Sequence, residues 1–195
     1  MTSLTSKAAI VTLPDAVLRQ RSQKVGIVTD TIQGIVQSMK DATLDWDQSR
    51  EHEVGVALAA PQIGKLFKII VVRNDFDDKD NKGFSVFINP IITKYEGQIE
   101  EDFEGCLSVP DIYGKVPRYS KVRVKALDIS GREFRVNAEG FLARVFQHEV
   151  DHLHGTLFID HIRDSKNAFY QLMPDGKLDQ LDYDKDVKDN RILWE

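Results

Sequence analysis

Two histidines and a glutamate form the most informative cluster of the sequence. The string QHEVDHLHG occupies residues 147–155, so His148 and His152 stand four residues apart with Glu149 between them. On an α-helix this spacing projects both imidazoles from one face, one turn apart. Two such imidazoles can bind one metal ion, and the intervening carboxylate can reach a water molecule beside it. The pattern therefore predicts a metal site with a candidate general base.

The sequence downstream of these histidines offers poor candidates for a third ligand. In metallopeptidases with the longer pattern HExxHxxGxxH, a third histidine follows ten residues after the first, and here that position holds Phe158. We expect His154 to point away from the ligand face, and His161 has the wrong spacing. Spacing alone leaves Asp160 and Asp164 open as ligands.

Cys106, the single cysteine of the chain, is the upstream candidate, and it lies in the string EGCLSVP of residues 104–110. One cysteine excludes a disulfide within the chain and fits a reducing compartment. A lone cysteine is commonly an inert core thiol. A thiolate is also a strong ligand for zinc or ferrous iron, and three protein ligands leave an open position for water. The glycine and polar residues around Cys106, and the missing third ligand, favour the ligand interpretation.

The periodicity of the chain predicts the elements that must position these residues. Residues 30–42 form an amphipathic helix with Asp30 as its N-cap, and residues 68–73 form a buried strand. Alternating apolar residues on both sides of Ser130–Gly131 indicate a half-exposed hairpin. From Ala138 to about Leu153 the period becomes helical and apolar over most of the circumference, which is typical of a central, buried helix. We expect an α+β fold with antiparallel strands packed around this metal-binding helix.

Composition narrows the class of protein. The formal net charge of the 195 residues is −5, with 42% apolar and 29% charged residues, as is ordinary for a globular protein. No apolar run is long enough to span a bilayer, and the mild acidity argues against specific nucleic-acid binding. The N-terminal segment lacks the apolar stretch of a secretory signal, so we expect a cytoplasmic protein.

The chain reads as one domain over residues 1–195, with an acidic extension from about residue 165 to 195. Residues 165–195 include many aspartates, which is typical of a solvated surface segment. The apolar residues Ile192, Leu193 and Trp194 nevertheless predict that the end of the chain docks on the body.

Three motifs together resemble the signature motifs of the peptide deformylases. They are GVALAAPQ at residues 55–62, EGCLSVP at 104–110 and QHEVDHLHG at 147–155. The similarity extends from about Ile10 to Arg163. The family removes the formyl group from the N-terminal formylmethionine of newly made bacterial and organellar proteins. The resemblance thus implies a nascent formylmethionyl polypeptide as partner, and it leaves open a transient contact with the ribosome.

The resemblance also implies a role for each matched residue. Cys106, His148 and His152 become the metal ligands and Glu149 the general acid and base. Gln62 would donate its side-chain amide to the formyl oxygen, and Leu107 its backbone N–H. The family characteristically uses Fe²⁺, while Zn²⁺, Ni²⁺ or Co²⁺ occur in purified material.

The substrate-binding residues are expected in the same three motifs. The resemblance makes Val56 and Gly105 candidates for strand-like hydrogen bonding to the peptide, whereas Gly55 could also simply serve a turn. Phe141 and Val145 share the helix face of His148 and either pack in the core or line the methionine pocket. Ala57 departs from the family, which usually has glycine at this position.

Some questions stay open at this stage. Arg118 and Arg144 are either structural ion-pair partners or peptide contacts. A metallopeptidase is disfavoured by Phe158, and a peptide-binding module with a purely structural metal is disfavoured by Glu149 and Gln62, which such a site does not need.

Overall fold

The computed structural model describes residues 9–50, 53–76, 78 and 80–194. Its first long element is helix α1 (Asp30–Gln48), which follows a short 3-10 helix, η1 (Ala16–Arg19). The predicted apolar face of α1 is buried, the last buried residue is Thr43, and the helix runs six residues beyond the expected end. Its N-cap is Thr29, so the prediction of Asp30 was one residue late.

The strands form one antiparallel sheet in the order β1-β2-β3-β4-β6-β7, with β5 also paired to β4. The bounds are β1 (Ala57–Ala59), β2 (Ile69–Arg73), β3 (Phe84–Cys106), β4 (Val109–Leu127), β5 (Glu133–Glu139), β6 (Phe169–Leu172) and β7 (Leu178–Gln180). The predicted strand at residues 68–73 and the hairpin around Ser130–Gly131 are confirmed as β2 and the β4–β5 pair. The 3-10 helix η2 (Ala60–Ile63) connects β1 to the chain leading into β2.

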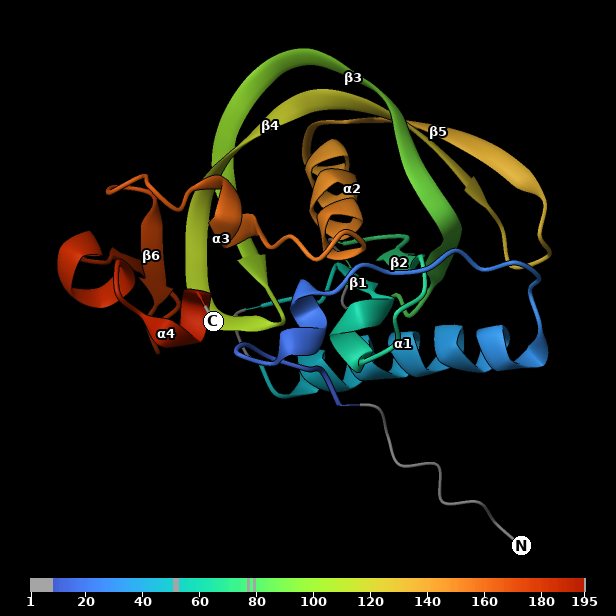
Figure 1. Cartoon of the computed structure of the whole chain (residues 1–195), viewed down its shortest axis with the longest axis horizontal. Helices are drawn as coiled ribbons and strands as arrows, with labels where there is room; N and C mark the ends of the chain where they lie inside the picture. The colour runs from blue at the N-terminus through green and yellow to red at the C-terminus, as the bar shows by residue number, and fades with distance from the viewer. Residues whose placement is uncertain (1–8, 51–52, 77, 79, 195) are drawn as a thin grey trace, which may run out of the picture.

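Strands β3 and β4 are unusually long and rise as an arch over helix α2 (Gly140–His152) (Figure 1). Their pairing shifts register at four places, between Ile88 and Cys106 on β3. Such irregularities bend a strand and increase its twist, so the ribbon can curve around a helix. The arch ends at residues 107–108, a two-residue turn that follows Cys106 directly.

Helix α2 is buried along almost its whole length, as its apolar circumference predicted. Every residue from Ala143 to Val150 is buried, and so is His152, whereas Phe141 in the first turn is half-exposed. Phe146 packs edge-to-face on Phe87 of β3 with a centroid separation of 4.9 Å. The α+β prediction is confirmed, and Cys106 at one end of the arch comes to lie against the helix that carries both histidines.

The C-terminal part continues through α3 (Phe158–His161), β6, β7, a single π-helical turn η3 (Tyr183–Val187) and α4 (Arg191–Trp194). The predicted docking of the terminus is confirmed, because Leu193 is buried and Trp194 donates its indole N–H to the carbonyl of Val187 at 2.6 Å. Arg19 donates to the carbonyl of Leu193 at 2.9 Å, which ties this end to the N-terminal part. None of the helices in the described part of the chain is long and apolar enough to cross a membrane.

Candidate metal centre and active site

Cys106, His148 and His152 converge at the end of the arch. Their donor atoms all lie within 4.8 Å of one another, and all three residues are buried. Cys106 Sγ and His148 Nε2 each lie 3.2 Å from His152 Nε2. Ligands at 2.0–2.3 Å in a tetrahedral site are separated by roughly 3.4–3.6 Å, so a small outward shift admits one ion. A thiolate and two imidazoles suit zinc or ferrous iron, and the donor set therefore fits a metal.

The downstream alternatives left open by the sequence are engaged elsewhere or lie apart. Asp160 accepts hydrogen bonds from Arg19 and from the backbone N–H of Leu157. His161 lies 2.7 Å from a carboxylate oxygen of Asp151. Neither of them, nor Asp164, belongs to the metal-ligand cluster found among the described residues.

Glu104 orients the first histidine of the metal-ligand cluster through a hydrogen bond. His148 Nδ1 donates to a carboxylate oxygen of Glu104 at 2.9 Å, which leaves Nε2 free to bind a metal. Burial raises the pKa of Glu104, but hydrogen bonds from His148 and Arg118 outweigh it and keep the pKa well below its usual range. Glu104 is therefore a carboxylate that orients a ligand. It stands in the cysteine motif, two residues before Cys106, yet sequence reasoning gave it no role.

Arg118 and Arg144 both form ion pairs within the protein, as one of the two expectations from the sequence had it, and Arg144 also lines the pocket. Both donate to Glu104, at 2.8 and 2.9 Å. Arg118 also pairs with Asp151, and Arg144 donates to the carbonyls of Val116 and Glu100. These bonds connect α2 to both strands of the arch. Both guanidinium groups form ion pairs with carboxylates of the protein.

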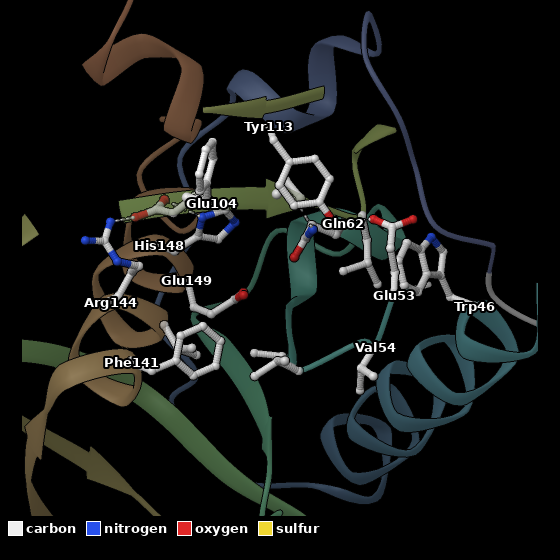
Figure 2. A pocket seen from close by; sticks show the side chains of 17 residues that line it. Trp46, Glu53, Val54, Gln62, Glu104, Tyr113, Phe141, Arg144, His148 and Glu149 are labelled. Atoms are coloured by element: carbon white, nitrogen blue, oxygen red, sulfur yellow. Dashed lines mark hydrogen bonds and ion pairs between the residues drawn. The ribbon is translucent and has the colours of Figure 1, made fainter. Parts of the chain in front are cut away.

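Glu149 is buried beside the metal-ligand cluster. Its Oε2 atom has no hydrogen-bond partner among the described residues. Burial is the main cause that raises the pKa of Glu149 to about 7, Glu104 adds to it, and His148 opposes it. In Figure 2 its carboxylate points into the centre of a pocket. A carboxyl group placed in this way can exchange a proton near neutral pH.

Gln62 and Leu107 stand on the pocket wall next to Cys106. The Gln62 carbonyl oxygen accepts the backbone N–H of Ala59 at 2.8 Å, which aims its amide nitrogen at Cys106 Sγ, 3.6 Å away. The same nitrogen lies 3.2 Å from the hydroxyl of Ser108. Leu107 occupies the turn between β3 and β4, so its backbone follows directly on the cysteine.

The pocket brings together most of the predicted substrate residues. Val56, Ala57, Gly105, Phe141 and Val145 line it. Besides Glu104, sequence reasoning did not single out five further lining residues: Trp46, Glu53, Val54, Phe103 and Tyr113. Trp46 lies at the end of α1, Glu53 in the loop that follows it, and Tyr113 on β4, and these places carry no motif.

Gly55 is not among the lining residues. A Cβ atom on Gly55 would lie 2.6 Å from the Thr43 side chain of α1. Its N–H donates to Asp47 and its carbonyl accepts from Arg73. The glycine lets the chain before β1 pass closely over α1.

A buried group of one cysteine and two histidines, beside a carboxyl group at the wall of a pocket, is the arrangement of a hydrolytic metalloenzyme. Comparison with known proteins agrees with this class. The chain matches the sequence profile of polypeptide deformylases over residues 7–168. It is similar to peptide deformylase of Thermomicrobium roseum, with 43% identity over 83% of this chain and 89% of that protein. Among solved structures, it is similar to Synechococcus elongatus peptide deformylase in complex with actinonin, with a TM-score of 0.72, 36% identity and coverage of 81% and 82% of the two chains. A Legionella pneumophila peptide deformylase aligns with a TM-score of 0.69, 41% identity and coverage of 78% and 83%.

The chain therefore belongs to the peptide deformylase family, the enzymes that remove N-terminal formyl groups from nascent polypeptides. The family resemblance inferred from the three motifs is confirmed.

Proposed function

We propose that Cys106, His148 and His152 hold one divalent ion and that this ion is Fe²⁺ in the cell. The mixed thiolate and imidazole donors support iron or zinc by softness, and the metal present is decided more by supply than by affinity. Zn²⁺, Ni²⁺ or Co²⁺ would occupy the same donors in purified protein. When bound, such an ion supplies a Lewis acid that makes water a nucleophile near neutral pH.

Glu149 is the general acid and base of the proposed reaction. It takes a proton from the attacking water and delivers it to the amine nitrogen as the bond between the formyl carbon and that nitrogen breaks. The products are formate and a peptide with a free N-terminus. The position of Glu149, which is buried and whose Oε2 has no hydrogen-bond partner among the described residues, is the single observation that carries the proposal.

Gln62 and Leu107 stabilise the negative charge that develops on the formyl oxygen. The Gln62 amide is already aimed at the cluster by its bond from Ala59, so little reorganisation is needed when the charge appears. The backbone N–H of Leu107 is the second donor.

Four further lining residues bind the substrate in this proposal. Phe141 and Val145 receive the methionine side chain, and the backbones of Val56 and Gly105 receive the peptide as an added strand. Gly55 acts indirectly, because its own N–H and carbonyl are bonded within the protein and position Val56.

The proposal also includes a partner and a compartment. The partner is the N-terminus of a nascent formylmethionyl polypeptide, met in the cytoplasm and with a transient contact to the ribosome. The chain acts as one domain over residues 1–195, with the acidic extension from about residue 165.

The test combines metal analysis of anaerobically purified protein with release of formate from formyl-Met-Ala-Ser. We expect one iron per chain and formate release that is lost on chelation and restored by Fe²⁺. Formate release that persists in fully chelated protein would contradict the proposal.

A further inference from the structure

Arg73, the last residue of strand β2, carries a charge that is shielded from solvent. Its side chain is 0% exposed, and its guanidinium pairs with the carboxylate of Asp47, which is 13% exposed and lies one residue before the end of α1. The guanidinium also lies over the ring of Phe84, 5.5 Å from the ring centroid. A charged group is costly to bury unless partners compensate it, so these contacts fix where Arg73 lies. No step of the proposed reaction uses this ion pair.

The ion pair holds the backbone at Gly55 from both sides. Asp47 Oδ1 accepts the backbone N–H of Gly55 at 2.5 Å, and Arg73 Nε donates to the Gly55 carbonyl at 3.2 Å. The backbone N–H of Arg73 donates to the carbonyl of Val56 at 2.8 Å. Three backbone groups of residues 55 and 56 are therefore bonded to the two members of one ion pair.

The segment held in this way is part of the pocket wall. Val54, Val56 and Ala57 line the pocket (Figure 2), whereas Asp47 and Arg73 are not among its lining residues. A displacement of residue 55 must carry both of its neighbours with it, because consecutive Cα atoms are only about 3.8 Å apart. The ion pair can therefore set the position of this wall without contacting anything that the pocket binds.

A contribution to stability alone accounts poorly for a buried ion pair at this place. Taking two charges out of water costs about as much free energy as their attraction returns, so such a pair adds little net stability. What it adds is a fixed geometry. The planar guanidinium of Arg73 donates to the carboxylate of Asp47 and to the carbonyl of Gly55 at the same time. That property suits a group that holds a backbone segment in one position.

We propose that Arg73 and Asp47 are positioning residues for peptide binding, which hold residues 54–57 where the backbone of Val56 can pair with the substrate. The inference rests on the proposed function, which makes Val56 a partner of the peptide backbone. A segment that is already ordered loses little conformational entropy when a peptide pairs with it. The ion pair therefore lowers KM and leaves kcat unchanged, because the gain is the same in the ground state and in the transition state.

Arg73→Lys is the first test. Lysine keeps a positive charge for Asp47, but it lacks the planar group that also donates to the Gly55 carbonyl. We expect KM for formyl-Met-Ala-Ser to rise about five- to thirtyfold while kcat changes by less than about twofold. For formyl-Met amide, which has no peptide beyond the methionine, KM should rise by less than about twofold. The metal content should equal that of the wild type, because neither residue belongs to the metal-ligand cluster.

Asp47→Asn is the second variant. The amide keeps an oxygen for the N–H of Gly55 and removes the charge that compensates Arg73. KM for formyl-Met-Ala-Ser should rise in the same way as in Arg73→Lys. The double variant should raise KM no further than the larger of the two single changes, because both residues act through one segment.

Arg19→Lys is the matched control. Arg19 also bonds to one carboxylate, that of Asp160 at 2.6 Å, and to one backbone carbonyl, that of Leu193 at 2.9 Å, and it does not line the pocket. Its KM and kcat should stay within about twofold of the wild type. An equal rise of KM in this control would overturn the assignment, since any lost arginine bond would then have the same effect.

Hydrogen exchange of the wild type supplies a test that does not depend on a variant that folds. Without any peptide bound, the Gly55 amide should exchange at least about 100-fold more slowly than in an unfolded chain, because it is already bonded to Asp47. Fast exchange at Gly55 would overturn the positioning role. So would an unchanged KM in folded Arg73→Lys and Asp47→Asn, a loss of metal, or an equal rise of KM for both substrates. Wild-type protein that releases no formate from formyl-Met-Ala-Ser would instead contradict the proposed function.

Discussion

Two carboxylate clusters stand on opposite sides of the same pocket. Glu104 is buried and bonded to Arg118, Arg144 and His148, and its side chain is only 4% exposed. Glu53 accepts a hydrogen bond from Tyr113 and lies 3.6 Å from Arg50, and its own side chain is 12% exposed. The first cluster orients a metal-ligand candidate, whereas the second joins β4 to the loop after α1 at the pocket wall. The two carboxylates differ because of their partners: Glu104 is bound by two arginines and a histidine, and Glu53 by a tyrosine with one arginine nearby.

The energetic consequences differ in the same way. Removing one member of a buried ion network leaves uncompensated charge in a medium of low polarity, which typically costs about 3–5 kcal/mol. An ion pair near solvent contributes about 0–1 kcal/mol. We expect variants of the Glu104 cluster to change folding and metal binding, and variants of the Glu53 pair to leave metal binding unchanged.

Glu104→Gln should give the largest effect. It leaves Arg144 and Arg118 with less compensation and weakens the hold on His148, so we expect a loss of about 3–5 kcal/mol in the free energy of unfolding. Metal affinity should fall by about 10- to 100-fold because the ligand loses its orienting carboxylate. Urea unfolding and competition with a chelator measure the two quantities.

Glu53→Gln is the paired variant on the opposite side of the pocket. It should retain metal affinity and change the free energy of unfolding by less than about 1 kcal/mol. Equal losses in both variants would show that the two clusters are not energetically distinct.

Glu149→Gln separates chemistry from binding within the buried region. The carboxylate has no bonding role at Oε2 in the described structure, so we expect the metal content and the melting temperature to stay close to wild type. The value of kcat should fall by at least ~10²-fold, the usual contribution of a positioned acid or base. Metal analysis and formate release on the same preparation check both parts. A loss of metal in proportion to activity would make Glu149 a structural residue.

The contrast between the clusters also explains what sequence could predict. The shared helix face of His148 and His152, with Glu149 beside them, could be predicted from helical periodicity, because all three residues lie within one stretch of five. Cys106 was a candidate from chemistry, and the family motifs strengthened it. Glu53 and Tyr113 are 60 positions apart and meet only through the tertiary fold. No periodicity encodes that contact. The length of α1 was underestimated for a different reason, since residues 44–48 contribute no buried side chain that an apolar pattern could reveal.

Ala57→Gly should give the smallest effect and tests the one residue that departs from the family pattern. Ala57 is 5% exposed, pairs with Val72 of β2 and belongs to the core cluster that contains Val145 and Phe146. Its extended strand conformation accepts a side chain, so alanine causes no backbone strain. Glycine would add entropy to the unfolded chain and remove a packed methyl group, and we expect a loss of about 0.5–1 kcal/mol in the free energy of unfolding. Ala57 also lines the pocket, but its burial in this core cluster leads us to expect an unchanged KM for formyl-Met-Ala-Ser. A several-fold decrease in KM at constant kcat would instead mean that the methyl group projects into the pocket and crowds the peptide in ground and transition states alike.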